Sequence, residues 1–119
     1  MEGQADFDSC VGKEISVLVL KDNTLSFVFT DGVNLDLFDN GQSCCEKRYA
    51  ETGDDLEYFV GSKLVSAEVN PGPTDDKGGE TRGCAFLVVT TDKGAFTVAN
   101  YNEHNGYYGG FLVSARVPK

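Results

Sequence analysis

The sequence predicts a single mainly-β domain in which six or seven antiparallel strands form a sandwich or a half-open barrel. Three observations support this fold class. Short apolar stretches alternate with polar residues at the period of two that strands require. Asp, Asn and Gly residues, which favour turns, separate these stretches at short intervals. The chain has 119 residues, which suits one domain with one core, so we treat residues 1–119 as a single unit.

The first half of the chain predicts a three-stranded meander. Strands are expected over 15–20 (ISVLVL), 24–30 (TLSFVFT) and 33–38 (VNLDLF). Tight turns are expected at 21–23 (KDN) and 31–32 (DG), because these residue types favour hairpins. The residues expected to face the core in the second and third strands are Leu25, Phe27, Phe29, Val33, Leu35 and Leu37.

The middle of the chain departs from this alternation. Residues 39–53 predict an irregular segment, and a short helix is expected near 54–60. Asp54 can cap the first turn of this helix, and Gly61 lies where the helix would end. Leu56, Phe59 and Val60 are expected on its apolar side.

The second half returns to strands. These are expected over 63–69, 84–91, 95–101 and 111–117. Two polar segments are expected to be mobile. They are the N-terminus at residues 1–10 and a loop at residues 70–82, which is rich in proline and glycine.

The two halves resemble each other, which is compatible with a duplicated meander or with the alternation that β-meanders share in general. Residues 11–13 (VGK) precede the first group of strands, and residues 60–62 (VGS) precede the second. At an offset of 61, the positions Leu25, Phe27, Thr30, Asp31, Leu35 and Leu37 match Phe86, Val88, Thr91, Asp92, Phe96 and Val98. The same offset sets Cys44 and Cys45 opposite Asn105 and Gly106. We therefore expect the two irregular loops to lie on one rim of the fold or to be related by pseudosymmetry.

The composition argues against several classes of function. The formal net charge is −9 and the isoelectric point is about 4.4, so a phosphate backbone would be repelled and direct nucleic-acid binding is not expected. No run approaches the roughly 20 apolar residues of a membrane helix. The polar start MEGQADFDSC argues against a signal peptide. We expect a cytoplasmic protein that does not contact a membrane.

The four cysteines are Cys10, Cys44, Cys45 and Cys84, and we expect free thiols in this compartment. Cys44, Cys45 and His104 are plausible metal ligands, but adjacent cysteines point in different directions and the chain has no C-x-x-C. A cysteine thiolate with His104 as its base is a second arrangement. The expectation is no cofactor and no catalytic set, with Cys44 in the core; a metal or thiol site remains an alternative.

The stretch NEHNGYYGG (102–110) is the main candidate for a binding surface. Tyrosine rings flanked by Asn, His and Gly make low-entropy contact surfaces of the kind that paratopes use. The alternative is that both rings cap the open end of the core. The glycine spacing does not match a phosphate-binding loop. The candidate contact residues are Glu103, His104, Asn105, Tyr107 and Tyr108.

The segments GQSCCEKRY (41–49) and EHNGYYGG (103–110) together resemble a small uncharacterised domain family found in bacteriophage and bacterial genomes. The resemblance spans roughly residues 11–117. Other members place a serine and an aromatic residue after Cys-Cys, where this chain has Glu46 and the residues that follow it, so that part of the match is loose. The resemblance implies a phage or prophage origin and transfers no catalytic residue. The matching positions are Gly41, Cys44, Cys45, Val60, Gly61, Asn105, Gly106, Tyr107, Tyr108, Gly109 and Gly110.

These observations favour a non-enzymatic, phage-associated accessory protein that binds a host protein, as an inhibitor or modulator of host defence. The acidic composition, the tyrosine–glycine loop and the lack of a catalytic set support this hypothesis. Two alternatives remain open. One is a domain that binds a small molecule or nucleotide between the two loops, and the other is the metal or thiol site of Cys44, Cys45 and His104. A homo-oligomer is a further option, because the terminal strand could offer a free edge.

Overall fold

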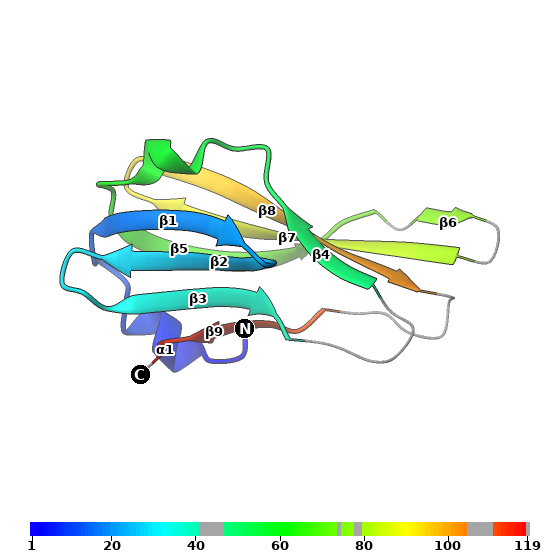
Figure 1. The fold of residues 1–119 in the computed structure, drawn as a ribbon, viewed down its shortest axis with the longest axis horizontal. Coiled ribbons are helices and arrows are strands. Elements are labelled where there is room, and N and C mark those ends of the chain that lie inside the picture. The colour runs from blue at the N-terminus through cyan, green and yellow to red at the C-terminus, as the bar shows by residue number, and fades with distance from the viewer. Residues whose placement is uncertain (41–46, 74, 78–79, 105–110, 119) are drawn as a thin grey trace.

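The first sheet combines the N-terminal meander with the last strand of the chain. The computed structural model describes residues 1–40, 47–73, 75–77, 80–104 and 111–118. Within these ranges the first sheet has four antiparallel strands in the order β1-β2-β3-β9 (Figure 1). Their bounds are Ile15–Lys21 (β1), Thr24–Phe29 (β2), Asn34–Asp39 (β3) and Val113–Arg116 (β9).

The second sheet stacks on the first. In the described part of the chain it has five strands, in the order β4-β8-β7-β5, and β6 pairs with the outer part of β7. The two-sheet arrangement confirms the predicted mainly-β sandwich. The strand bounds are Lys47–Glu51 (β4), Leu64–Pro71 (β5), Asp75–Lys77 (β6), Glu80–Thr91 (β7) and Gly94–His104 (β8); the helices are α1 (Gln4–Asp8) and the 3-10 helix η1 (Leu56–Phe59).

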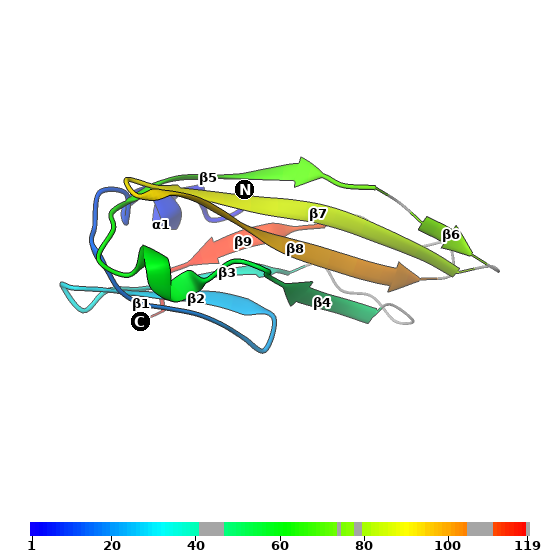
Figure 2. The ribbon, with the colours of Figure 1, turned by 90° about the horizontal axis from the view of Figure 1, so that it is seen from above.

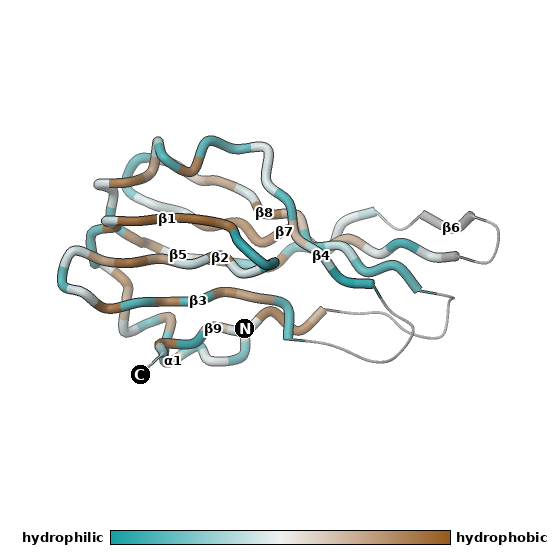
Figure 3. Tube along the Cα trace, in the orientation of Figure 1, coloured by the Kyte–Doolittle hydropathy of each residue, from teal (hydrophilic) through white to brown (hydrophobic). Residues whose placement is uncertain are grey.

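The core fills the space between the two sheets. Every second side chain of β2 is buried, and so are Leu35 and Leu37 of β3, as the alternation predicts. The hydropathy colouring shows apolar positions along the sandwich body and hydrophilic ones toward the free ends of β4 and β8 (Figure 3). The largest fully buried apolar side chains are Ile15, Leu25, Phe27, Phe29, Leu35, Leu37, Leu64, Val89, Phe96 and Val98.

The two sheets share one strand plan, as the repeated sequence pattern predicts. The meander β1-β2-β3 corresponds to the meander β5-β7-β8. The first strand of each meander carries the same irregularity, a register shift between Ile15 and Val17 in β1 and between Leu64 and Ser66 in β5. A bulge at equivalent positions shows that the two meanders correspond residue by residue at their starts.

The register corrects the predicted offset in one strand. Leu25 pairs with Leu37 in the first sheet, and Leu87 pairs with Val98 in the second. Leu37 and Val98 are 61 residues apart, as predicted, but Leu25 and Leu87 are 62 apart. The predicted match of Leu25 with Phe86 is therefore wrong, since Phe86 lies on the outer face and Leu87 is buried. The hairpin turn after β2 holds one residue more than the turn after β7, which accounts for the change.

Reciprocal hydrogen bonds join the starts of the two meanders. The Gly12 N–H donates to the carbonyl oxygen of Leu64, and the Gly61 N–H donates to that of Ile15, each over 2.8 Å. Gly12 stands in the same place relative to Ile15 as Gly61 does relative to Leu64. Exchange of the two halves therefore leaves this pair of bonds unchanged, which is the mark of an approximate two-fold axis.

The fourth strand of each half is exchanged. β4 follows the first meander but pairs with β8 of the second sheet, and β9 follows the second meander but pairs with β3 of the first. Each half therefore completes the sheet of the other half, as in a strand-exchanged dimer contained in one chain. This exchange ties the two sheets together covalently at both crossings.

Two strands lie where none was predicted. Residues 39–53 were expected to be irregular, but they contain β4, in which Tyr49 pairs with Tyr101 of β8. The expected loop at 70–82 contains β6 and the first residues of β7. Few apolar residues occur in either stretch, so the alternation that predicts a half-buried strand is weak there.

One of the two helices lies where the sequence predicts a helix, and the other lies in a segment that was expected to be flexible. η1 forms within the range 54–60, but Asp55 caps it by accepting the Glu57 N–H at 3.2 Å. Asp54, the predicted cap, instead accepts the Thr97 N–H at 2.8 Å. The N-terminus, expected to be flexible, folds into α1 and buries Phe7 in the core.

The molecule is elongated because β7 and β8 are longer than the strands of the first sheet. Its principal extents are 48 × 27 × 20 Å and its radius of gyration is 14.8 Å, against about 13.5 Å for a compact domain of this length. Both views show β7 and β8 running past the first sheet toward β6 (Figures 1 and 2). We call this part, formed by β4, β6 and the adjoining ends of β7 and β8, the projecting end. In the described residues no helix has the length and apolar character to cross a membrane.

Candidate functional site

The projecting end separates two of the predicted contact residues onto opposite faces of β8. Successive residues of a strand point to opposite sides. His104 pairs with Thr81 and follows the inward-facing positions of β8, whereas Glu103 pairs with Arg82 on the outer face. The projecting end therefore has two distinct surfaces, an inner one that continues from the core and an outer one that faces away from the first sheet.

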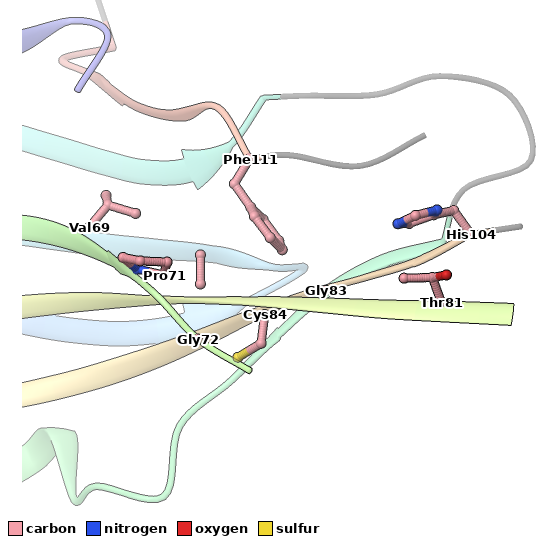
Figure 4. Close-up of a pocket in the computed structure, with 9 residues that line it drawn as sticks. Val69, Pro71, Gly72, Thr81, Gly83, Cys84, His104 and Phe111 are labelled. Atoms are coloured by element: carbon pink, nitrogen blue, oxygen red, sulfur yellow. The ribbon is translucent and has the colours of Figure 1, made fainter. Parts of the chain in front are cut away.

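A pocket lies on the inner surface at the base of the projecting end. Its volume is about 490 Å³, and it opens to solvent. His104 and Thr81 stand on one side, and the Phe111 ring reaches in from the segment before β9 (Figure 4). Most of the lining is apolar, with the imidazole and hydroxyl groups at one end. The lining residues are Val69, Pro71, Gly72, Thr81, Gly83, Cys84, Ala85, His104 and Phe111.

Phe111 is positioned by the backbone beside it. The Leu112 N–H donates to Asp39 Oδ1 at 2.9 Å, and the Asn40 N–H donates to the Leu112 carbonyl oxygen at 2.7 Å. These bonds fix the chain as it enters β9. The ring packs over Gly83, where an added Cβ would lie 3.6 Å from Phe111 Cε2, an ordinary van der Waals contact. Phe111 therefore covers the inner face of β7 where the first sheet ends.

An ion pair joins the two sheets behind this ring. Arg48 Nη1 of β4 lies 2.6 Å from Asp39 Oδ2 of β3, and both side chains are largely buried. The Arg48 guanidinium also lies 6.0 Å from the centroid of the Phe111 ring, within the range of a cation–π contact. Asp39 thus holds both Arg48 and the segment that carries Phe111. The pocket wall is fixed by charge-assisted contacts rather than by apolar packing alone.

The outer surface carries a stacked row of aromatic and cationic side chains. Tyr49 of β4 and Tyr101 of β8 stack at a centroid distance of 5.0 Å with 25° between their planes. Lys47 Nζ lies 5.5 Å from the centre of the Tyr49 ring, and Arg82 Cζ lies 5.1 Å from that of Tyr101. We call Lys47, Tyr49, Tyr101 and Arg82 the tyrosine ladder. Both rings are half-buried, so the ladder is ordered yet accessible.

Glu103 completes the charge pattern of the outer surface. In the sheet register it lies opposite Lys47 on one side and opposite Arg82 on the other. Opposite charges at directly paired positions of neighbouring strands attract each other. Lys47 and Arg82 therefore flank the two tyrosine rings, with Glu103 opposite both of them in the register.

The thiols that the structure describes are poor nucleophiles. Burial raises the pKa of the Cys84 thiol above its usual value, and the nearby Arg82 lowers it by a smaller amount. Burial likewise raises the pKa of Cys10. Both are free cysteines, as predicted. A protonated thiol neither attacks carbonyl groups nor ligates metals readily, and the described residues include no cluster of three or more His, Cys, Asp or Glu side chains arranged for a metal ion.

Comparison with known proteins gives a family but no activity. The model of the family described as "Domain of unknown function (DUF7448)" matches residues 8–113, which include both meanders. The chain belongs to this family. The match confirms the resemblance to an uncharacterised domain family. No curated protein and no solved structure matches the chain.

Several predicted site residues lie outside the described part of the chain. They are Cys44, Cys45, Asn105, Tyr107 and Tyr108. The described residues that flank them are brought together. Asn40 hydrogen-bonds Leu112, and Lys47 pairs with Glu103. The segments that lead into both parts of the sequence motif therefore meet at the projecting end, next to the pocket and the tyrosine ladder.

Sequence reasoning missed most of the residues that build the two surfaces. Tyr49 fell in a segment expected to be irregular, and Phe111 was expected inside the last strand, which begins only at Val113. Tyr101 was placed in a strand, but its partner was unknown. The one available signal was the period of two along 95–101, which puts Tyr101 on the opposite face from Val98. Only His104 and Glu103 were singled out in advance.

Proposed function

We propose that the protein is a non-enzymatic binding module that captures a protein partner with its projecting end. The tyrosine ladder carries this proposal. Stacked tyrosines clamped by cations present a large amphipathic area and lose little side-chain freedom on binding, which is why tyrosine and arginine dominate binding hot spots. The ladder also stands beside Glu103, a residue that the sequence predicted for contact.

The pocket extends the same surface to the inner side of β7 and β8. An open concavity of about 490 Å³, walled by Phe111 and bordered by His104 and Thr81, suits an anchoring side chain of the partner. Following the resemblance to phage and bacterial domains, we place this activity in the cytoplasm of a host cell. There the module would inhibit or modulate a host protein, such as a component of host defence.

The test is capture of a partner from host-cell extract by variants of the immobilised protein, followed by affinity measurement with the purified partner. Replacement of Tyr49 and Tyr101 by alanine is expected to weaken binding by about tenfold or more, because hot-spot truncation typically costs at least about 2 kcal/mol. Tyr58→Ala is the matched control. This residue is 59% exposed and has Lys93 Nζ 5.6 Å from the centre of its ring, but it lies near the turn after β7, at the opposite end of the hairpin.

Unchanged binding by the Tyr49/Tyr101 variant, or equal loss by Tyr58→Ala, would show that the ladder is not the contact surface. The predicted pair Tyr107 and Tyr108 can be replaced in the same assay. If no protein partner is retained and a nucleotide or other small molecule instead raises the melting temperature, the pocket is a small-molecule site. Phe111→Ala should then abolish that rise.

A further inference from the structure

The edges of the two sheets differ in how they are closed. An open edge displays unpaired N–H and C=O groups that invite another strand, so proteins normally cover it. The β9 edge, which the sequence suggested as free, is covered by the N-terminus. Ala115 N–H donates to the Glu2 carbonyl oxygen at 2.8 Å, and Glu2 N–H donates to that of Val113 at 3.2 Å. The terminal strand therefore does not offer the edge.

The β4 edge is covered by a side chain. Asn23, in the turn between β1 and β2, accepts the Ala50 N–H through Oδ1 at 3.0 Å. Its amide nitrogen donates to the Arg48 carbonyl oxygen at 3.4 Å. One asparagine thus satisfies a donor and an acceptor of this short strand, and it stands where another strand would pair.

The β5 edge is guarded in two ways. At its start, Leu64 exchanges backbone hydrogen bonds with Gly12 and Lys13, of 2.8 and 3.1 Å. Farther along, the exposed Glu68 places a charge on the edge, and Pro71 ends the strand. Charged residues and proline are common devices that prevent edge-to-edge pairing.

In the described part of the chain, the β1 edge has none of these protections between Ser16 and Leu20. Its start is held by the bond from Gly61 to Ile15, and η1 packs near the strand. Among the described residues, no backbone hydrogen bond from outside β2 reaches the stretch beyond. This stretch has no charged residue and no proline, and it exposes Val17 by 43% and Val19 by 44%. Figure 3 shows apolar positions along much of β1.

We propose that β1 pairs with β1 of a second copy of this chain in an antiparallel, two-fold symmetric dimer. The strand is self-complementary about Leu18, whose side chain points into the core. With Leu18 on the axis, Val17 of one copy stands opposite Val19 of the other. Both valines lie on the outer face beside Val28 and Ser26 of β2, so the valine pairs form on one side of the joined sheet.

The charge distribution also favours a second copy of the chain as the partner of β1. The chain has a formal net charge of −9, so two copies repel each other over most of their surfaces. Around β1 the charges cancel, since Lys13 and Lys21 balance Glu14 and Asp22, and β2 carries no charged residue. The β1 edge is therefore a place where two acidic chains can approach closely. The joined four-stranded sheets would form one continuous sheet across the axis.

The test is the molar mass of the full chain by sedimentation or light scattering over a range of concentrations. The wild type is expected to dimerise. Val19→Lys should raise the dissociation constant by about tenfold or more, because it sets a lysine from each copy against the apolar edge. The matched control is Val65→Lys on β5, the corresponding edge strand of the other sheet, where the valine is 47% exposed. It should leave the dimer intact.

A wild type that stays monomeric at high concentration would overturn the proposal. So would a dimer that Val65→Lys disrupts as strongly as Val19→Lys. Hydrogen exchange of the wild type gives a second readout without any substitution. Amides of Ser16–Leu20 should exchange more slowly at high protein concentration, and those of Val65–Val69 should not change. The reverse pattern would assign the interface to β5 and reject β1.

Discussion

The two halves of the molecule, residues 11–51 and 60–117, follow one strand plan but differ in the length of their strands. In the first half β2 and β3 have 6 residues each, whereas their counterparts β7 and β8 have 12 and 11. The shared part of both meanders encloses the core. The extra length of β7 and β8 forms the projecting end, where the pocket and the tyrosine ladder lie.

This comparison separates what builds the fold from what serves binding. Positions that correspond in the two halves, such as Leu25 with Leu87 and Gly12 with Gly61, face the core or join the sheets. The candidate site occurs where the second half has no counterpart in the first. Selection for a fold acts on both halves alike, but a binding surface needs only one of them to be extended. The experiments below test whether the halves are energetically equivalent where they match.

The largest effect is expected from paired truncation of the core. Leu25→Ala and Leu87→Ala each remove a leucine that is 1% or 2% exposed, at corresponding positions of β2 and β7. Each is expected to lower the free energy of unfolding by about 2–5 kcal/mol, and by similar amounts, because both leave a cavity in one shared core. Urea unfolding of the two variants measures this. Val65→Ala, at an exposed site, should change stability by less than about 0.5 kcal/mol.

Unequal losses of unfolding free energy in the two variants would show that the two halves are not energetically equivalent. If Leu87→Ala cost less than half as much as Leu25→Ala, the second meander would relax into its cavity more easily than the first. The core would then depend mainly on the first half. Equal losses with a common denaturant dependence would show that the two sheets unfold as one cooperative unit.

A smaller effect is expected at the two glycines that precede the meanders. Gly12 has φ 88° and Gly61 has φ 90°, in the left-handed region that disfavours other residues. A Cβ at either site meets no atom closer than 3.9 Å, so the cost of alanine comes from backbone strain alone. Each substitution should therefore cost about 1–2 kcal/mol, and the two costs should agree.

The matched control for these variants is Gly53→Ala. Its site also has no atom within 4 Å of an added Cβ, and its backbone is outside the left-handed region. Alanine there should be neutral or slightly stabilising, because it restricts the unfolded chain. The melting temperatures of the three variants distinguish the cost of backbone strain from the general effect of replacing a glycine. A Gly61 cost far above that of Gly12 would indicate that the two junctions are not equivalent.

The sequence was sufficient where the signal is local. Alternation located β1, β2, β3 and the inner parts of β7 and β8, and the Asp22-Asn23 turn adopts the positive φ values that a tight hairpin requires. Gly61 marked the end of η1. Each of these features depends on neighbours a few residues away, so residue type alone predicts it.

The site depends on contacts between distant parts of the chain, which one sequence does not display. β4 became a strand because its five residues pair with β8 about fifty positions later. Tyr49 and Tyr101 form a stack only in that register. Likewise, Phe7 is buried because α1 packs against β9 at the other end of the chain. The sequence predicted His104 from its residue type but not the face on which it would lie.

The smallest effect concerns a contact present in only one half. Lys13 forms an ion pair with Asp31 in the turn after β2. The corresponding Asp92, in the turn after β7, instead accepts the backbone N–H of Lys63 at 2.8 Å. The hydrogen bond from Lys13 lowers the pKa of Asp31 below its ordinary 3.8, and the same bond raises the pKa of Lys13 above its ordinary 10.5. The first junction should therefore depend on pH and salt more than the second.

The sign of the pH dependence follows from the lowered pKa of Asp31 and the raised pKa of Lys13. The stabilisation from Asp31 is present above its ordinary pKa and is lost as the pH falls through the lowered value. That from Lys13 is lost only as the pH rises through its raised value. Wild type should thus exceed Asp31→Asn in urea midpoint at neutral pH, and the gap should close in strong acid and in about 1 M salt, where the Debye length is about 3 Å. Asp92→Asn keeps an acceptor oxygen, so its smaller difference should not respond to salt. The opposite result would be a salt-dependent difference in urea midpoint for Asp92→Asn and none for Asp31→Asn. It would show that the charge-dependent contact lies in the second half and not in the first.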